Sequence, residues 1–302
     1  MFSDIVFDYL KGYKFESSDD FNHDVESSEG KRIRKDRYEI STREESEKYD
    51  KPIGKYELIS IPDVLVFDKK DIEKCVDEVT ESIKGMIGKI SSKDRILIVG
   101  LGNRHISSDS LGTKVVSGIN ITIENKHLPK VMAIAPSVMG LTGIETVEIV
   151  EGVVSKVNPT HVIIIDSLCA SAVERLGKSI QLTNNGICPG GGIGNKRKCI
   201  GKDIAPNVFS IGVPLLIYAS TFVKDTFERH GIDEEKINSI MHITKKLSNK
   251  DDFLDILYNL NMILDDGVED IIVSIKDIEE CVEILAKIIS RSINNALGVN
   301  EY

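Results

Sequence analysis

The 302-residue sequence lacks any apolar run that approaches the roughly 20 residues of a membrane span. Its opening stretch, MFSDIVFDYLKGYKF, mixes Asp and Lys into the apolar positions and so lacks the continuous apolar region of a signal peptide. Positive charge is also scarce, with 38 Lys and Arg against 48 Asp and Glu and a formal net charge of −10. A nucleic-acid surface needs clustered cations, and the run Lys196-Arg197-Lys198 is too short to supply one. We therefore expect a cytoplasmic protein that binds neither membranes nor nucleic acid directly.

Cysteine is sparse and unpaired in pattern. The five cysteines are odd in number and scattered, and no C-x-x-C pair occurs among Cys75, Cys169, Cys188, Cys199 and Cys281. This pattern favours neither a zinc ribbon nor a disulfide framework, so we expect free thiols in a reducing compartment. No H-E-x-x-H or Walker A motif is present, and the sequence gives no reason to expect a metal or another cofactor.

Composition divides the chain into three parts. Residues 1–52 are expected to form a polar, partly mobile N-terminal segment with a short strand at 37–40, because residues 15–52 show almost no apolar periodicity. Residues 53–230 and 271–302 carry the patterns of an α/β core. Residues 231–270 are charged and weakly patterned, and we expect a helical insertion or subdomain there.

The core alternates strand and helix patterns, which predicts a three-layer α/β/α fold with a mostly parallel sheet. The strand patterns are KYELISIPDV (55–64), RILIVG (95–100), KVMAIAP (130–136), HVIIID (161–166), KSIQLT (178–183) and NVFSIGVP (207–214). Helices are expected at 71–87, 109–119, 215–229 and 275–297. A further helix should run to about residue 156, opened by a capping box from Thr142 to Glu145.

Two aspartates follow predicted core strands. Asp109 comes after the first strand across the turn Gly100-Leu101-Gly102-Asn103, and Asp166 ends the strand HVIIID. Ligand sites of open α/β sheets lie at the carboxyl ends of strands, so neighbouring strands would bring both carboxylates to one crevice.

The two carboxylates should differ in pKa, as acid–base chemistry requires. A helix N-terminus would favour ionised Asp109, whereas burial would raise the pKa of Asp166. A peptide hydrolase could use one as a base on water and the other as an acid on the leaving amine. The alternative from spacing alone is that Asp109 caps a helix and Asp166 ends a strand in a turn.

Other readings of the turn are less specific. A dinucleotide fingerprint needs G-x-G-x-x-G, but position 105 is His. A metal site could in principle be assembled from the two aspartates with His105 or Glu145. The nearby serines lack a G-x-S-x-G elbow, which argues against a Ser-His-Asp hydrolase.

Several stretches in order resemble the germination protease family, the endopeptidases of spore-forming Firmicutes. They are VGLGNRHISSDSLG (99–112), AIAPSVMGLTGIET (133–146), HVIIIDSLCASAVERL (161–176), SIQLTNNGICPGGGIGNKRK (179–198), FSIGVPLLI (209–217) and the ending at 271–297. The resemblance implies a phosphorylase/hydrolase-like fold related to hydrogenase-maturation peptidases. It also implies an atypical aspartic-type endopeptidase that hydrolyses small acid-soluble spore proteins in the forespore or spore core.

The resemblance places the family's two essential aspartates on Asp109 and Asp166. It also implies a homotetramer made as a zymogen. We expect further residues to bind substrate or support the site, namely Gly102, Asn103, His105, Glu145, Asn195, Lys196 and Arg197.

The sequence departs from the family pattern at the turn, where Ser107-Ser108 replace Thr-Pro and Thr113 replaces Pro. Ser3 to Asp8 resemble the start of the mature enzyme, which leaves two residues before it and favours a member without a propeptide over a processed form. Three rival functions remain open at this stage: a hydrogenase-maturation-type peptidase, a peptidyl-tRNA hydrolase, and a paralogue that binds spore proteins without cutting them.

Overall fold

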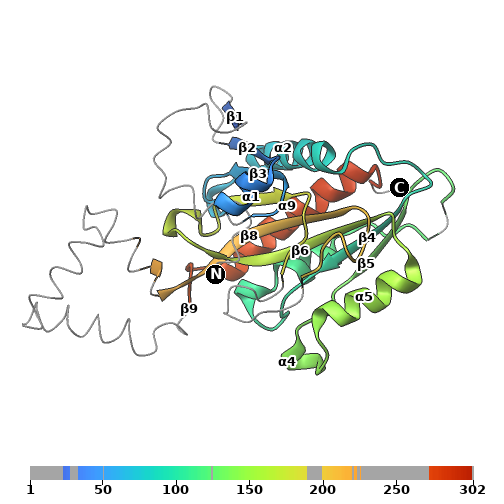
Figure 1. Cartoon of the computed structure of the whole chain (residues 1–302). Coiled ribbons are helices and arrows are strands. Elements are labelled where there is room, and N and C mark those ends of the chain that lie inside the picture. Colours follow the sequence, from blue (N-terminus) through green and yellow to red (C-terminus); the bar gives the residue numbers. More distant parts are fainter. Residues whose placement is uncertain are drawn as a thin grey trace, which may run out of the picture.

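The fold is built on one mixed β-sheet with helices on both of its faces (Figure 1). The computed structural model describes residues 23–27, 33–49, 51–123, 125–188, 199–219, 221–222, 225 and 272–300. Within these residues nine strands pair in the order β1-β2-β3-β7-β8-β6-β4-β5, and β9 also pairs with β8. Their bounds are β1 His23–Ser27, β2 Arg34–Ile40, β3 Gly54–Ser60, β4 Arg95–Gly100, β5 Lys130–Ile134, β6 His161–Ala170, β7 Ser179–Thr183, β8 Val208–Tyr218 and β9 Ile272–Ser274.

The centre of the sheet is parallel. Strands β5, β4, β6 and β8 run in one direction, with Ile98 of β4 opposite Ile163 of β6 and Ile163 opposite Phe209 of β8. The middle strands are continuous in apolar residues because both of their faces are covered. This arrangement confirms the expected α/β fold. The carboxyl end of β4 lies beside Ile165 of β6, and β6 continues to Ala170.

Antiparallel strands extend this parallel centre on the side of β8. Strand β7 pairs antiparallel with β8, and β3, β2 and β1 continue outward from it. The expected strand at 37–40 is confirmed and begins earlier, at Arg34. Lys35 is buried in β2, and its Nζ lies 2.8 Å from Glu78 Oε2 of helix α2 (Lys69–Ile87). This ion pair connects the charged strand to the rest of the fold.

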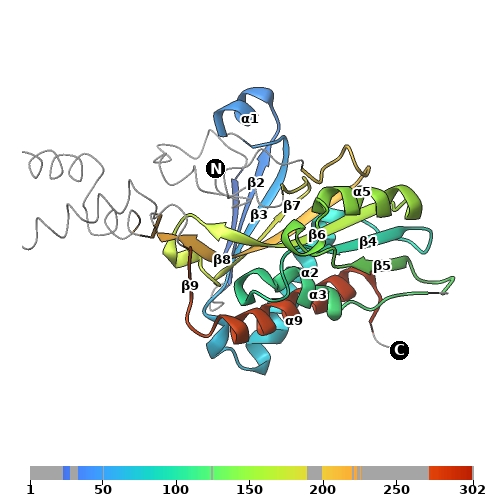
Figure 2. The same ribbon diagram turned by 90° about the horizontal axis from the view of Figure 1, so that it is seen from below.

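Helices cover the two faces of the sheet (Figure 2). On one face lie α2 (Lys69–Ile87), α3 (Leu111–Ser117) and α9 (Ile278–Leu297), which bury one apolar core against β4, β6 and β8. On the other face α5 (Thr146–Val157) buries a second core, to which Tyr49 of α1 (Arg43–Tyr49) also belongs. The remaining elements are α4 (Met139–Thr142) and the short 3-10 turns η1 (Val64–Val66), η2 (Ser107–Asp109) and η3 (Val173–Arg175).

Three local predictions are wrong. Residues 215–218 continue β8 instead of starting a helix, because their backbone pairs with β6 and β9. No capping box opens α5: Glu145 is its N-cap residue but makes no side-chain bond there, while Thr142 ends α4. The helix expected at 109–119 begins at Leu111, since Asp109 lies in the preceding 3-10 turn.

The cysteine prediction is also wrong for one pair. Cys188 and Cys199 form a disulfide, although no sequence pattern marks them as partners. Cys75, Cys169 and Cys281 are buried and remain thiols. Among the described residues, no helix has both the length and the hydropathy of a membrane span. The insertion expected at 231–270 lies outside the described residues.

Candidate active site

The turn after β4 packs closely against Ile165 of β6. The Leu101 N–H donates to the Ile165 carbonyl at 2.8 Å, so β4 stays bonded to β6 as it leaves the sheet. A Cβ added to Gly112, at the start of α3, would lie 2.6 Å from that same carbonyl oxygen. Glycine at 112 therefore lets the first turn of α3 approach the residue that precedes Asp166.

Asp109 is held by the same turn. Its Oδ2 accepts a hydrogen bond from the Asn103 N–H at 2.8 Å, and Asn103 Oδ1 accepts from the His105 N–H at 2.9 Å. Gly102 has a φ of 106°, and a Cβ there would lie 2.0 Å from the Asp109 carbonyl oxygen. A left-handed residue without a side chain is required at this position, so Gly102 and Asn103 orient the carboxylate.

Burial raises the pKa of Asp109 to about 6, and the bond from the Asn103 N–H offsets this only in part. The expectation that a helix N-terminus favours ionised Asp109 is wrong in direction. Helix α3 starts two residues later, at Leu111, and its cap residue Ser110 makes no side-chain cap bond. Desolvation therefore outweighs the single N–H donor.

Asp166 lies on β6 just beyond the last residue of β4, opposite Gly212 of β8. It is 8% exposed, and its Oδ1 accepts the Ser167 N–H at 2.9 Å. Burial raises its pKa well above the ordinary value, and the negative charge of Asp109 raises it further. The two carboxyl groups thus interact electrostatically beyond the end of β4. The prediction that Asp166 ends its strand is wrong, because β6 continues to Ala170 by pairing with β8.

The pair has the properties that acid–base chemistry requires. Asp109 has its pKa near 6 and is ionised at neutral pH, while burial and the charge of Asp109 both favour the protonated form of Asp166. Because the two groups are coupled, they titrate as a pair and their charges are not independent. A water molecule or peptide bond between them would face a base and an acid.

The other predicted site residues are distributed unevenly. His105 is exposed in the turn after β4, and Glu145 is half-buried before α5. Asn195, Lys196 and Arg197 lie outside the described residues. No group of three or more His, Cys, Asp or Glu side chains gathers in the part of the chain that the structure describes, so the alternative three-ligand metal site with His105 or Glu145 does not form.

Ser167 also lies in the region of the site, although no sequence pattern predicts a role for it. It is 9% exposed, and its hydroxyl has no hydrogen-bond partner within the described residues. Its strand partner Val213 belongs to the core on the α9 face, so the Ser167 side chain points to that face of the sheet. Position beside Asp166 was the only available signal, because a lone serine in an apolar strand carries no motif.

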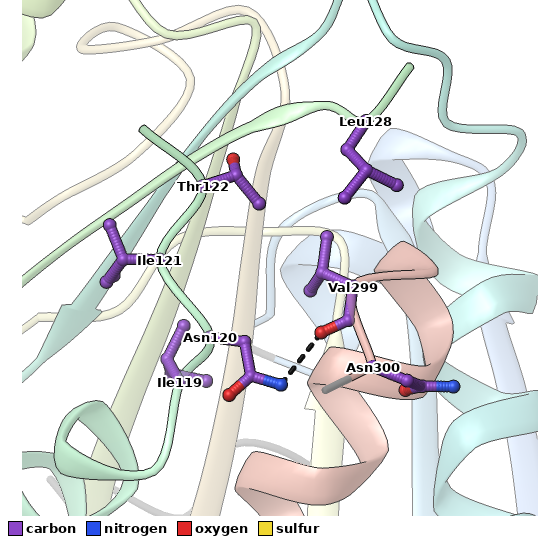
Figure 3. A pocket seen from close by; sticks show the side chains of 7 residues that line it. All are labelled: Ile119, Asn120, Ile121, Thr122, Leu128, Val299 and Asn300. Carbon is purple, nitrogen blue, oxygen red and sulfur yellow. Dashed lines mark hydrogen bonds between the residues drawn. The ribbon is translucent and has the colours of Figure 1, made fainter. Parts of the chain in front are cut away.

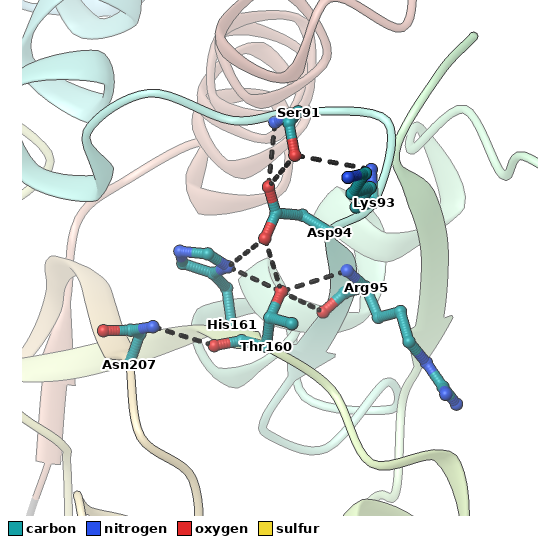
Figure 4. Close-up of polar contacts among 7 residues, drawn as sticks. All are labelled: Ser91, Lys93, Asp94, Arg95, Thr160, His161 and Asn207. Atoms are coloured by element: carbon teal, nitrogen blue, oxygen red, sulfur yellow. Dashed lines mark hydrogen bonds and ion pairs between the residues drawn. The ribbon is translucent and has the colours of Figure 1, made fainter. Parts of the chain in front are cut away.

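Two polar or hollow features lie at the opposite, amino edge of the parallel strands. Asp94, Thr160 and His161 are joined by hydrogen bonds there, with Thr160 Oγ1 2.8 Å from His161 Nδ1 (Figure 4). A pocket of about 540 Å³ opens between the loop before β5 and the end of α9 (Figure 3). Its lining has no titratable side chain, comprising Ile119, Asn120, Ile121, Thr122, Leu128, Val299 and Asn300. Neither feature contributes to the aspartate pair.

Comparison with known proteins decides the family. A family model described as germination protease matches residues 11–232. The germination protease of Caldanaerobacter subterraneus subsp. tengcongensis is 35% identical over 266 residues, which cover 82% of this chain and 79% of that protein. The chain belongs to the germination protease family. A germination protease of Clostridium perfringens (strain SM101 / Type A) is 34% identical over 284 residues, covering 87% of this chain and 83% of that protein.

Membership of the germination protease family makes the chain a peptidase. Among solved structures, the NiFe hydrogenase maturation protease HycI from Thermococcus kodakarensis KOD1 matches with a TM-score of 0.36 and 13% identity, covering 71% of this chain and 99% of that one. The α/β assignment follows from the strand order of the chain itself.

Proposed function

We propose that this member of the germination protease family is an endopeptidase that hydrolyses small acid-soluble spore proteins, with Asp109 and Asp166 as its catalytic residues. The observation that carries the proposal is the pair of interacting carboxyl groups beyond the carboxyl end of β4. A structural pair of capping residues would not need two desolvated carboxyl groups beside each other, since that arrangement lowers stability.

The surroundings of the two groups assign the roles. Asp109, with a pKa of about 6, is ionised at neutral pH and takes a proton from the attacking water. Asp166 is desolvated beside the charge of Asp109, and both effects raise its pKa, so it keeps its proton and delivers it to the leaving amide nitrogen. The hydroxide adds to the scissile carbonyl carbon, the C–N bond then breaks, and the pair ends with the proton on Asp109.

Apolar side chains are exposed at the same edge of the sheet and suit a protein substrate. Ile106 is 50% exposed in the turn that carries Asp109, and Leu141 is 54% exposed in α4, which follows β5. We assign them to the binding of apolar substrate residues next to the scissile bond.

The proposal also includes a homotetramer in the forespore or spore-core cytoplasm. The zymogen stage implied by the family resemblance competes with the member without a propeptide that the match at Ser3 to Asp8 favours. Light scattering of the purified full chain tests the tetramer. N-terminal sequencing of the active enzyme, compared with the chain as synthesised, tests whether activation removes a segment.

The deciding experiment incubates purified small acid-soluble spore proteins with the wild type, Asp109→Asn and Asp166→Asn, with and without a chelator. We expect cleavage by the wild type, a loss of at least about 1,000-fold in both variants, and no effect of the chelator. Asp203→Asn is the matched control, because Asp203 is an exposed carboxylate away from the pair. We expect this control to cleave at the wild-type rate.

Each rival function predicts a different result. Binding without cleavage by the wild type would identify a non-cleaving paralogue, and loss of cleavage with chelator would identify a metal-dependent maturation-type peptidase. Full activity of Asp166→Asn would refute the assigned roles. The pH dependence gives a second check: kcat/KM should fall as the pH drops through about 6, where Asp109 gains its proton.

A further inference from the structure

The disulfide joins the two exposed cysteines of the chain. Cys188 and Cys199 are 11 residues apart with Cα atoms at 4.0 Å, and both lie at the surface. The other three cysteines are buried, two of them at 0% and 1% exposure. Thiol reagents and small disulfides in solution can therefore reach one pair and not the rest.

A short antiparallel bridge brings these two cysteines together. The Ile187 N–H donates to the Ile200 carbonyl at 3.0 Å, and the Ile200 N–H donates back at 2.8 Å. Gly186 permits this approach, because a Cβ there would lie 1.8 Å from the Ile200 carbonyl oxygen. The disulfide thus joins two segments, residues 185–188 and 199–201, that backbone hydrogen bonds already hold side by side, and we call this pair of segments the hairpin.

The base of this hairpin covers the core on the α5 face of the sheet. Ile187 and Ile200 are 6% and 0% exposed and belong to the same apolar cluster as Tyr56 and Val150. Separation of Ile187 from Ile200 would open the core to water.

Polar contacts connect the hairpin to two strands. The Ser210 hydroxyl of β8 donates to the Asn185 carbonyl at 2.9 Å, and Asn185 Nδ2 donates to the Tyr56 hydroxyl of β3 at 3.1 Å. The Cys188–Cys199 bond lies one residue beyond the Ile187–Ile200 bridge on each side. Its state therefore bears directly on how firmly the hairpin is held.

We propose that Cys188 and Cys199 are a reversible redox modification site, and that their disulfide stabilises the packing of this hairpin over the core. A small disulfide such as glutathione disulfide supplies the oxidising equivalents. The Cys188 thiolate attacks one sulfur of the reagent, which breaks its S–S bond and releases one glutathione thiolate. Cys199 then attacks the Cys188 sulfur and releases the second glutathione, so two protein thiols are oxidised as one disulfide is reduced. An excess of a small thiol reverses both steps.

The surroundings of the remaining thiols support this selectivity. Burial raises the pKa of both Cys75 and Cys281 to about 12, so neither supplies a thiolate near neutral pH. Accessible disulfides are also the ones that small thiols reduce readily, whereas buried structural ones resist reduction. The site acts whether or not the chain cleaves spore proteins, because it involves neither Asp109 nor Asp166.

The test treats the reduced full-length protein with glutathione disulfide and follows intact mass and amide hydrogen exchange. The wild type should lose two hydrogens in mass with no glutathione retained, and peptide mapping should join Cys188 to Cys199. Cys188→Ser and Cys199→Ser should each stop at the mixed disulfide with one glutathione attached. Cys75→Ala, the matched control at a buried thiol, should respond as the wild type does.

The stabilising effect of the disulfide is measured at the Ile187–Ile200 bridge. Exchange of the Ile187 and Ile200 amide hydrogens should be at least about tenfold slower in the oxidised protein. The melting temperature should be higher by about 5 °C, as expected when a loop of this length is closed. Failure of the wild type to form the Cys188–Cys199 bond would overturn the redox site. Equal exchange rates of both amide hydrogens in the oxidised and the reduced protein would refute the stabilisation of the hairpin by the disulfide.

Discussion

Asp109→Asn should stabilise the folded protein at neutral pH while it removes the proposed catalytic base. The ionised carboxylate is partly desolvated in the fold, which is why its pKa rises from 3.8 to about 6. Asparagine has nearly the same shape, and its side-chain oxygen can still accept the bond from the Asn103 N–H. The substitution therefore removes the cost of burying a charge and keeps the local geometry.

The magnitude follows from linkage between proton binding and folding. A pKa raised by about two units corresponds to about 3 kcal/mol, and residual exposure to water reduces this to about 2 kcal/mol. The folded state binds the proton more tightly, so the penalty is absent below pH 3.8 and grows as the pH rises. It reaches its full size once the pH passes the folded pKa of about 6. At pH 7 the variant should gain about 5 °C in melting temperature.

The assay is urea unfolding of the wild type and Asp109→Asn at pH 4 and at pH 8, with Asp203→Asn as the exposed control. The difference in free energy of unfolding should be small at pH 4 and about 2 kcal/mol in favour of the variant at pH 8. Asp203→Asn should differ from the wild type by less than about 0.5 kcal/mol at both values. A stabilisation by Asp109→Asn of equal size at both pH values would refute the reasoning, because desolvation of a carboxylate must depend on its ionisation.

Three further predictions concern positions elsewhere in the fold. Gly102→Ala should abolish cleavage and destabilise the protein by about 2 kcal/mol or more, since its Cβ would collide with the Asp109 carbonyl; chemical unfolding and activity measure both effects. Gly152→Ala, the matched glycine in α5 with nothing within 4 Å, should instead stabilise by about 0.5–1 kcal/mol. Asp94→Asn should lower the pKa of His161 further, because burial already lowers it and the Asp94 charge opposes that shift; NMR titration measures the change.

Much of the parallel centre could be predicted from the sequence. The run RILIVG has the bounds of β4, and HVIIID begins β6 at the predicted residue, because a strand buried on both faces must be apolar throughout. Because the apolar residues are continuous, the sequence does not show where such a strand ends. Residues 215–218 were predicted as helix, and they belong to β8 since β6 and β9 supply partners for their backbone.

The disulfide shows a different limit. Nothing in the spacing of Cys188 and Cys199 distinguishes them from the other three cysteines, because a disulfide depends on which Cα atoms come close in space. The Ile187–Ile200 bridge provides that closeness, and it depends in turn on the burial of both isoleucines.

For the candidate site, the sequence by itself determined the candidates Asp109 and Asp166, since one follows a buried strand across a glycine turn and the other follows a continuous apolar run. It did not show that Asp166 lies inside β6, which continues to Ala170 by pairing with β8. The tertiary structure alone decided the electrostatics. Sequence position suggested that a helix terminus would favour ionised Asp109, but packing of the turn against β6 raises its pKa. Desolvation depends on every atom that excludes water from a group, and those atoms come from segments far apart in the chain.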